Sequence, residues 1–271
     1  MAEAKWPEPE NIHLPQTGVD SHAHLDSGKL WPDFISVLQR GKQAGLCRIG
    51  QVFLNHAAYV EKIEIMAAHQ ELFFMLGVHP SDGHLAAPDE WDNLASDFST
   101  DNRLCAVGEI GLDFYWKDCP RELQVAIFRL QLRMARAHDR AVVIHSREAF
   151  IETIEILDEE GWIGGPLLWH CFGGGKNQAM EIIRRGWYIS IPGPVTYPAN
   201  SVLREAVAEV PADRIMIETD CPYLSPQQWR GKRNEPALSV FTAQAVAQAR
   251  GMDTSELWTL CGCNSLRFFG L

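Results

Sequence analysis

Residues 105–145 read CAVGEIGLDFYWKDCPRELQVAIFRLQLRMARAHDRAVVIH, and this stretch contains the clearest helical pattern of the chain. One short apolar run ends at Glu109 and another ends at His145. Between them, Pro120 is a favoured first residue of a helix. Apolar residues at helical spacing follow it, namely Leu123, Ala126, Ile127, Leu130 and Met134. A strand, a helix and a second strand in this order predict one βα unit of a parallel sheet.

The same unit recurs along the chain. Six further apolar runs end near Asp20, Leu54, His79, His170, Ile191 and Asp220. Together with the two runs quoted above they make eight, the number of strands that closes a barrel. The runs are rich in Val, Ile and Leu, which is typical of strands buried on both faces. We therefore expect an α/β fold, specifically a (β/α)8 TIM barrel.

The domain organisation is expected to be simple. Residues 1–18 are expected to be an N-terminal extension, and residues 19–271 a single barrel domain. The region 81–100 is expected to form a loop and a short helix that begins near Pro88, and a closing helix is expected over residues 254–269. No apolar run of about 18 residues predicts a membrane span. The first residues lack the apolar core of a signal peptide.

The polar residues that end the strands suggest chemistry. In a barrel, the C-terminal ends of all strands converge on one mouth. Imidazole and carboxylate groups there are the usual ligands of Zn²⁺, Mn²⁺ or Fe²⁺, and leaving them buried without partners would cost several kcal/mol. His22 and His24 are two residues apart in a strand and so face the same way. The sequence therefore predicts a metal site formed by His22, His24, Glu109, His145, His170 and Asp220, with His79 beside it.

Several short motifs carry a resemblance to a known family. They are Asp20-Ser21-His22-Ala23-His24-Leu25-Asp26, Gly77-Val78-His79-Pro80, Gly108-Glu109-Ile110-Gly111-Leu112-Asp113, Val143-Ile144-His145-Ser146-Arg147, His170-Cys171-Phe172-Gly173-Gly174, Glu218-Thr219-Asp220-Cys221-Pro222-Tyr223-Leu224 and Arg230-Gly231-Lys232-Arg233-Asn234-Glu235-Pro236. In this order they resemble the TatD family of deoxyribonucleases in the amidohydrolase superfamily. The resemblance runs from about Gly18 to the C-terminus. One departure is the segment 191–194, IPGP, which replaces a more typical Ser-Gly turn.

The resemblance implies a metal-dependent hydrolase with two divalent ions (Zn, Mn or Mg). His22, His24 and Asp220 would hold one ion, His145 and His170 the other, and Glu109 would bridge them. Such a pair polarises a phosphoryl oxygen and lowers the pKa of a bound water toward about 7. Asp220 is placed to accept the proton of that water as general base. The implied activity is that of a deoxyribonuclease of the exonuclease type, acting on single-stranded DNA or DNA ends.

Other residues are candidates for binding substrate. The resemblance implies that His79 contacts phosphate, although a structural hydrogen bond is the alternative. Arg147 lies two residues after His145 and is expected to clamp phosphate. The loop with Arg230 and Arg233 follows the last strand, where barrels often bind phosphate; a solvated loop is the alternative.

Further residues near the motifs have two interpretations each. Glu218 either orients a ligand or is structural. Tyr115 and Trp116 either stack on a base or fill the core. Cys171 and Cys221 adjoin predicted ligands but, as neighbouring strand residues, are expected to pack on the opposite face.

Composition and charge limit these interpretations. Seven cysteines without paired CxxC motifs are expected to be reduced thiols of a cytoplasmic protein. The net charge of −11 opposes binding of nucleic acid at long range, but two divalent ions would add about four positive charges where they matter. A small-molecule phosphoester, ester or amide is the alternative substrate. A non-catalytic subunit that binds nucleic acid or protein is the third hypothesis, disfavoured by the complete ligand set.

Overall fold

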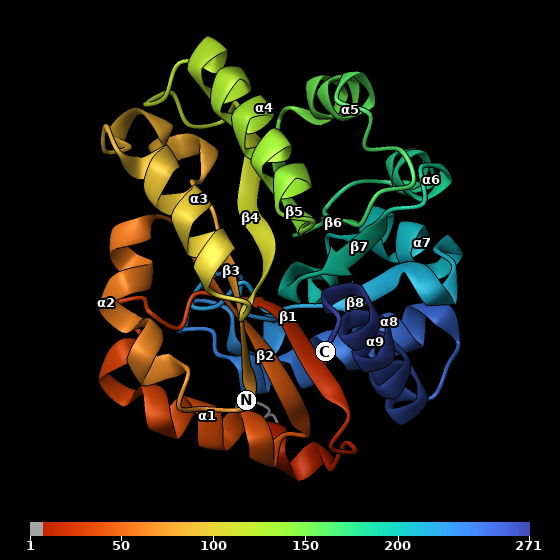
Figure 1. Ribbon diagram of the computed structural model, residues 1–271. Coiled ribbons are helices and arrows are strands. Elements are labelled where there is room, and N and C mark those ends of the chain that lie inside the picture. Colours follow the sequence, from red (N-terminus) through yellow and green to blue (C-terminus); the bar gives the residue numbers. More distant parts are fainter. Residues whose placement is uncertain (1–7) are drawn as a thin grey trace.

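Eight parallel strands form a barrel in the computed structural model, which describes residues 8–271 (Figure 1). The strands pair in chain order, each with the next. Their bounds are β1 Gly18–Ala23, β2 Leu46–Phe53, β3 Leu72–Leu76, β4 Leu104–Asp113, β5 Ala141–Arg147, β6 Leu167–Trp169, β7 Tyr188–Ile191 and β8 Ile215–Ile217. The prediction of a (β/α)8 TIM barrel is confirmed.

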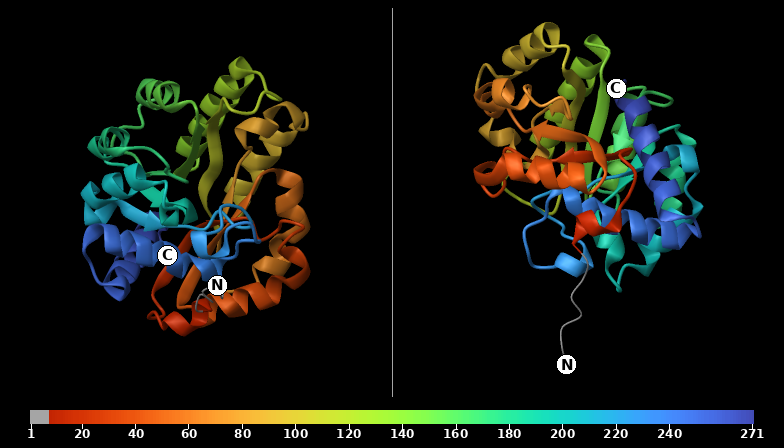
Figure 2. Two further views of the ribbon diagram at one scale, coloured as in Figure 1. Left: turned by 180° about the vertical axis from the view of Figure 1, so that it is seen from behind. Right: turned by 90° about the horizontal axis from the view of Figure 1, so that it is seen from below.

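Helices surround the strands on the outside (Figures 1 and 2). They are α1 Phe34–Gln43, α2 His56–Met66, α3 Glu90–Thr100, α4 Arg121–Ala137, α5 Phe150–Glu159, α6 Lys176–Arg184, α7 Ser201–Glu209, α8 Ser239–Arg250 and α9 Thr254–Phe269. The closing helix has the predicted bounds. In the region 81–100, a 3₁₀ segment, Pro80–Leu85, precedes α3, so the expected loop and short helix are both present.

The barrel closes between its first and last strands. An isolated bridge joins Ala23 to Cys221, just beyond the end of β8. The amide of His24 donates to the carbonyl of Cys221 (2.8 Å), and the amide of Asp220 donates to the carbonyl of His22 (3.0 Å). The backbone that closes the barrel therefore also holds the segment His22-Ala23-His24 against Asp220.

The core has two parts. A smaller cluster joins inward-facing residues of most strands, among them Val19, Val52, Met75, Val143 and Met216, with Phe269 from the end of α9. A larger cluster packs the outer faces of the strands against the helices. Because the inner cluster fills the barrel, the mouth at the C-terminal strand ends is the place where polar groups gather.

Helix α4 buries a different face from the one predicted. Pro120 is its N-cap residue, one position before the helix. Ile127 and Met134 are buried as expected, but Leu123 and Leu130 are 37% and 39% exposed. Two glutamines, Gln124 and Gln131, are buried in the place expected for apolar residues. An apolar count could not identify this face, because both glutamines bond the backbone of neighbouring strand ends, as described below.

The expected N-terminal extension is described in part. Residues 1–7 lie outside the described residues. Trp258 donates a hydrogen bond to the carbonyl of Pro15 (2.9 Å), and Gln16 donates to the carbonyl of Leu46 (2.5 Å), so this segment is held against α9 and β2. None of the helices formed by residues 8–271 has the length and hydropathy needed to cross a bilayer.

Gly262 provides a test of the packing of α9 on the start of β1. A Cβ atom at this position would collide with the carbonyl oxygen of Thr17. We expect Gly262→Ala to lower the free energy of unfolding by about 1–3 kcal/mol, the range for overpacked sites, measured by urea denaturation. Gly28→Ala is the matched control, because no atom lies within 4 Å of its new Cβ. Equal stability of the two variants would contradict this packing.

Candidate metal centre

Four side chains from three distant parts of the sequence converge beside β1. The Nε2 atoms of His22 and His24 lie 3.3 Å apart. The Oε2 atom of Glu109 lies 3.4 Å from the first and 3.8 Å from the second. The Oδ1 atom of Asp220 lies 3.3 Å from His24 Nε2 and 3.9 Å from His22 Nε2. The predicted ligands of the first ion therefore surround one point.

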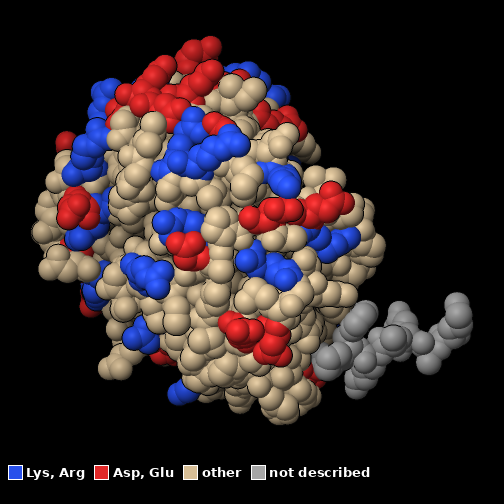
Figure 3. All heavy atoms as spheres, turned by 90° about the vertical axis from the view of Figure 1, so that its right-hand side faces the viewer, with Lys and Arg blue, Asp and Glu red and all other residues tan. Residues whose placement is uncertain are grey.

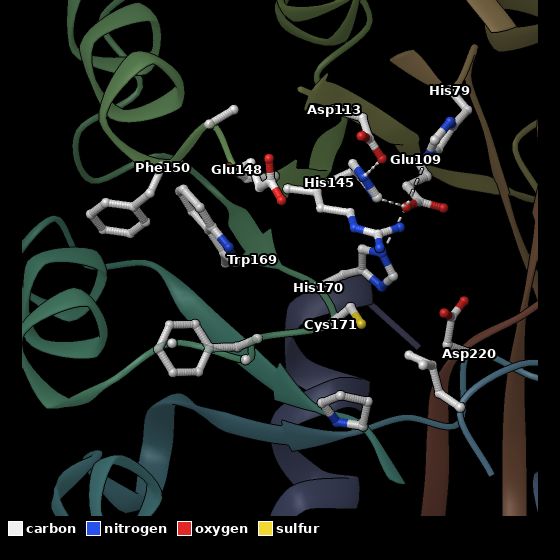
Figure 4. Close-up of a pocket in the computed structure, with 18 of the residues that line it drawn as sticks. His79, Glu109, Asp113, His145, Glu148, Phe150, Trp169, His170, Cys171 and Asp220 are labelled. Atoms are coloured by element: carbon white, nitrogen blue, oxygen red, sulfur yellow. Dashed lines mark hydrogen bonds and ion pairs between the residues drawn. The ribbon is translucent and has the colours of Figure 1, made fainter. Parts of the chain in front are cut away.

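The other carboxylate oxygen of Glu109 faces a second group (Figure 4). His145 Nδ1 lies 2.5 Å and His170 Nε2 lies 2.7 Å from Glu109 Oε1. One oxygen of Glu109 is thus directed at the His22–His24 pair, and the other at the His145–His170 pair. A carboxylate that bridged two ions would present its oxygens in this way.

The position of Glu109 along its strand differs from the prediction. Glu109 does not end β4, which continues to Asp113. The register of β4 on β5 shifts between Val107 and Ile110, so the backbone at Glu109 departs from regular pairing. The predicted end of the strand at Glu109, the first polar residue, was too early, because Ile110 and Leu112 continue the strand beyond it. His79 and Asp220 were also predicted at strand ends. His79 lies three residues after the last residue of β3, and Asp220 lies three residues after the last residue of β8.

Two further carboxylates stand behind the histidines of the second group. Asp113 Oδ2 lies 2.9 Å from His145 Nε2. Glu218 lies 3.3 Å from His170 Nδ1 and also accepts hydrogen bonds from the amide of Cys171 and the hydroxyl of Ser190. Each histidine therefore has one nitrogen beside a carboxylate of its own and the other directed at Glu109. This contact favours the orienting role of Glu218 over a purely structural one.

The chemistry of this donor set fits a metal ion. If His145 and His170 donate to Asp113 and Glu218, their remaining nitrogens present lone pairs to Glu109. Burial raises the pKa of Glu109, but the surrounding histidines outweigh it and hold the pKa well below its ordinary value, so the carboxylate is ionised. When the two rings are neutral, their lone pairs and the ionised oxygen repel one another unless a cation lies between them. In the metal-free protein, protons on the rings take that place, because the neighbouring carboxylates raise the pKa of both histidines. Divalent ions satisfy this requirement and accept all of these ligand types.

His79 lies beside Glu109 but presents a hydrogen-bond donor to it. The amide of Ser81 donates to His79 Nδ1 (3.1 Å), so the proton of the neutral ring is on Nε2. Burial lowers the pKa of His79 to about 3, which keeps the ring neutral. Its Nε2 lies 3.6 Å from Glu109 Oε1. An N–H group directed into the centre can donate to an anion but cannot bind a metal ion.

One side of the mouth carries a cluster formed by Tyr115, Trp116 and Arg147, which we call the rim cluster. The guanidinium of Arg147 lies over the ring of Tyr115, 3.8 Å from its centre, and 5.9 Å from that of Trp116. The rings are 45% and 52% exposed, so they do not fill the core. Among residues 8–271, Arg147 forms no ion pair or hydrogen bond through its guanidinium, whose donors stay free.

The basic loop after β8 does not join the centre. Arg233 pairs with Asp33 (2.6 Å) and Glu235 (3.3 Å), and Arg230 stacks over Tyr197, 4.7 Å from the ring centre. Neither arginine lines the cavity at the mouth. The prediction placed both at the phosphate site because they follow the last strand, but Arg233 is committed to neighbouring carboxylates.

The centre opens into a cavity of about 1400 Å³. Its polar end holds His24, Glu109, His145, His170 and Asp220. Its other end is largely apolar, with Phe150 and Trp169 near the carboxylate of Glu148 (Figure 4). Further apolar lining residues are Phe172, Pro192, Pro194 and Leu203. The unusual IPGP segment after β7 therefore supplies part of the apolar wall.

The two cysteines beside predicted ligands differ in their surroundings. Cys221 is fully buried, as expected for a packing residue. Cys171 lines the cavity instead (Figure 4), which departs from the prediction. Burial and three nearby carboxylates raise the pKa of its thiol well above the ordinary value in the metal-free protein. Cys171 belongs to none of the groups of metal-type donors that lie close together among residues 8–271.

Comparisons with known proteins agree with the site. The family model described as TatD related DNase matches residues 19–270. Bacillus subtilis (strain 168) has a similar protein, named uncharacterized metal-dependent hydrolase YabD, 33% identical over 92% of this chain and 98% of that protein. The human deoxyribonuclease TATDN3 is 31% identical over 93% of this chain and 94% of its own length.

A solved structure has the same architecture. The crystal structure of YJJV, a TatD homolog from Escherichia coli K12, superimposes with a TM-score of 0.89 at 25% sequence identity. The match covers 94% of this chain and 98% of that one. The similarity therefore extends over the whole barrel.

Proposed function

Because the chain belongs to the TatD-related DNase family of metal-dependent hydrolases, we propose that it cleaves phosphodiester bonds of DNA, as an exonuclease with two divalent ions. The observation that supports this most directly is the placement of Glu109, whose two carboxylate oxygens face separate histidine pairs. His22, His24 and Asp220 would hold one ion, and His145 and His170 the other, with Glu109 shared. When bound, such a pair polarises the phosphoryl oxygen and activates a water for attack.

Asp220 is our candidate general base. Burial raises its pKa, but the hydrogen bond from His24 and the charge of the neighbouring histidines outweigh burial and lower it below the ordinary value. The carboxylate is therefore ionised at neutral pH and able to accept a proton. Its side chain lines the cavity and is 15% exposed, so a water in the mouth can reach it.

His79 and Arg147 would hold the phosphate. The neutral His79 ring presents Nε2–H toward the centre, as its hydrogen bond from Ser81 requires. Arg147 adds a charged donor with a planar fork, suited to two oxygens of one phosphate. Both side chains line the same cavity as Glu109. Negative charge that develops on phosphorus oxygens would meet a neutral and a charged donor together.

The mouth suits single-stranded DNA or a DNA end. Glu109 and His170 are 4% and 3% exposed, so a scissile phosphate must enter the cavity to reach them. Exposed rings at the rim, Trp116 on one side and Tyr223 on the other, would stack on unpaired bases. A phosphate inside a duplex is flanked by paired bases, which cannot stack on these rings.

Surface charge gives little help in attracting DNA. On the face that Figure 3 shows, basic and acidic side chains are interspersed. With a net charge of −11, attraction must be local, from the ions, Arg147 and Lys29 at the mouth. Lys29 lies over the ring of Tyr223, 5.5 Å from its centre. The seven free thiols are in keeping with a cytoplasmic location, which we also propose.

The experiment that tests this function is a defined substrate panel. Linear single-stranded DNA labelled at either end, the same strand circularised, and a blunt duplex are incubated with Mg²⁺, Mn²⁺ or Zn²⁺. We expect stepwise shortening of the linear strand, an intact circle and slow attack on the duplex. Chelator and His145→Ala should each abolish the reaction. Degradation that persists in both would show that the nuclease is a contaminant.

One observation favours a second candidate substrate. Among the described residues that line the cavity, Arg147 is the only lysine or arginine. The carboxylates of Glu148 and Glu152, near Phe150 and Trp169, would repel a second phosphate. A small phosphoester with an apolar leaving group, or a related ester or amide, would fit there. Turnover of such an ester with no attack on any DNA of the panel would favour this alternative.

Arg147 gives a quantitative prediction for the proposed substrate. Removal of a hydrogen-bonding cation at phosphate typically costs about 1.5–3 kcal/mol. We therefore expect Arg147→Ala to lower kcat/KM on single-stranded DNA roughly 10- to 150-fold, with Arg147→Lys intermediate. Arg233→Ala is the control, because that side chain is engaged by Asp33 outside the cavity and should leave the rate unchanged. Equal losses in both variants would contradict a role of Arg147 at phosphate.

A further inference from the structure

Asp113 is a buried carboxylate to which the mechanism above assigns no role. It is 1% exposed and ends β4, four residues after Glu109. Its Oδ2 atom contacts His145 Nε2 at 2.9 Å, while its Oδ1 atom accepts hydrogen bonds from the amides of Tyr115 (2.9 Å) and Trp116 (3.1 Å). One side chain therefore touches both a predicted metal ligand and the loop of the rim cluster.

The position of Asp113 is itself held by α4. Gln124 accepts from the amide of Asp113 and donates to its carbonyl, each at 2.8 Å. Gln131, two turns later, clamps Val78 in the same way, at 2.7 and 3.0 Å. Helix α4 thus fixes both Val78, which precedes His79, and Asp113, which contacts His145. These contacts explain why the two glutamines are buried.

We propose that Asp113 is a positioning residue that joins the second metal site to the rim cluster. Its ionised Oδ2 accepts from His145 Nε2–H, which leaves the lone pair of Nδ1 directed at Glu109 and available to an ion. Its Oδ1 orders Tyr115 and Trp116, the rings beside Arg147. An ion bound by His145 would lock this ring and hence Asp113, so metal binding would order the rim, and binding at the rim would strengthen metal binding. This inference rests on the proposed two-ion site.

Asp113→Asn separates the two contacts. An asparagine keeps an oxygen for the amides of Tyr115 and Trp116, but its NH₂ group now faces His145 Nε2. That nitrogen must then accept, so the ring proton moves to Nδ1, where the ion should bind. We expect Asp113→Asn to weaken binding of the second ion about 10- to 100-fold, the usual effect of losing a partner behind a ligand. The order of the rim should remain.

Asp113→Ala removes both contacts. We expect it to weaken binding of the second ion as well, and to increase hydrogen exchange of the amides at Tyr115 and Trp116, which no longer have an acceptor. Asp118→Asn is the control, since Asp118 lies in the same loop but is exposed. Ion binding is measured calorimetrically with Mn²⁺ on chelated protein, and hydrogen exchange by mass spectrometry with and without Mn²⁺. Thermal melts check that each variant is folded.

The expected pattern is specific. In the wild-type protein, Mn²⁺ should slow exchange at residues 114–119. In Asp113→Asn this slowing should require 10- to 100-fold more Mn²⁺, and in Asp113→Ala it should be lost. Asp113→Asn with wild-type affinity for both ions, or rim exchange that does not respond to Mn²⁺, would overturn the inference. These readouts need no DNA, so failure of the proposed nuclease activity would be seen separately, as intact DNA with fully loaded wild-type protein.

Discussion

Glu109→Gln should abolish hydrolysis while leaving the barrel folded. An amide has one oxygen instead of two and carries no charge, so it cannot serve both histidine pairs, which lie 3.4–3.8 Å from one oxygen and 2.5–2.7 Å from the other. Both ions depend on Glu109, so its loss should disable the whole metal centre. Removing one member of such a catalytic group typically costs most of the rate enhancement that the group provides. We expect kcat on single-stranded DNA to fall roughly 10³- to 10⁵-fold.

The measurement combines turnover with metal analysis on the same samples. The Glu109→Gln protein should retain fewer than two ions per chain after dialysis against Mn²⁺. Glu159→Gln is the matched control, because Glu159 is an exposed carboxylate of α5 whose one ion pair among residues 8–271 is with Arg129. Substantial activity in Glu109→Gln with full metal content would show that the shared carboxylate is not needed, and the two-ion proposal would fail.

The convergence of these imidazole and carboxylate side chains was predictable, because each follows from one strand and one motif. His22 and His24 are two apart at the end of the first strand, the second of them one residue beyond it, and His145 and His170 end apolar runs. The convergence of parallel strand ends then places them together without knowledge of any contact. The fold was predictable for the same reason, since alternating strands and helices leave few topologies.

The contacts that tune the centre depend on distant partners. Asp113 and His145 are 32 residues apart, and Glu218 and His170 are 48 apart, so local patterns cannot show that they meet. A signal for Asp113 was present, because it occupies the end of the apolar run that carries Glu109. For Arg233, the sequence predicted a contact with phosphate because its basic loop follows the last strand. In the structure the Arg233 side chain pairs with Asp33 instead.

Chelation of metal should lower the melting temperature substantially at alkaline pH. An ion present at about 1,000 times its dissociation constant stabilises the folded state by about 4 kcal/mol, roughly 8–16 °C for a chain of this size. In the metal-free protein, the nitrogens around Glu109 repel that carboxylate once the histidines lose their protons. We therefore expect a large difference between Mn²⁺-loaded and EDTA-treated protein at pH 8.

The difference in melting temperature between Mn²⁺-loaded and EDTA-treated protein should shrink as the pH falls. Burial lowers the pKa of His145 and His170, but Glu109, Asp113 and Glu218 outweigh it, so both lie above the ordinary 6.5 in the metal-free protein. A raised pKa stabilises that protein at acidic pH, and this contribution is lost as the pH rises through the folded pKa. The ions must displace these protons, so their affinity falls about tenfold per pH unit for each proton displaced.

The melting temperatures of the Mn²⁺-loaded and the EDTA-treated protein should therefore coincide near pH 5.5 and diverge toward pH 8. Scanning calorimetry measures both. Glu109→Gln is the control, because without the shared carboxylate EDTA should change its melting temperature far less at any pH. A gap that is constant from pH 5.5 to 8 would mean that the ions do not compete with protons on the histidines. Since imidazole binds metal only when neutral, the ligands would then have to be other residues.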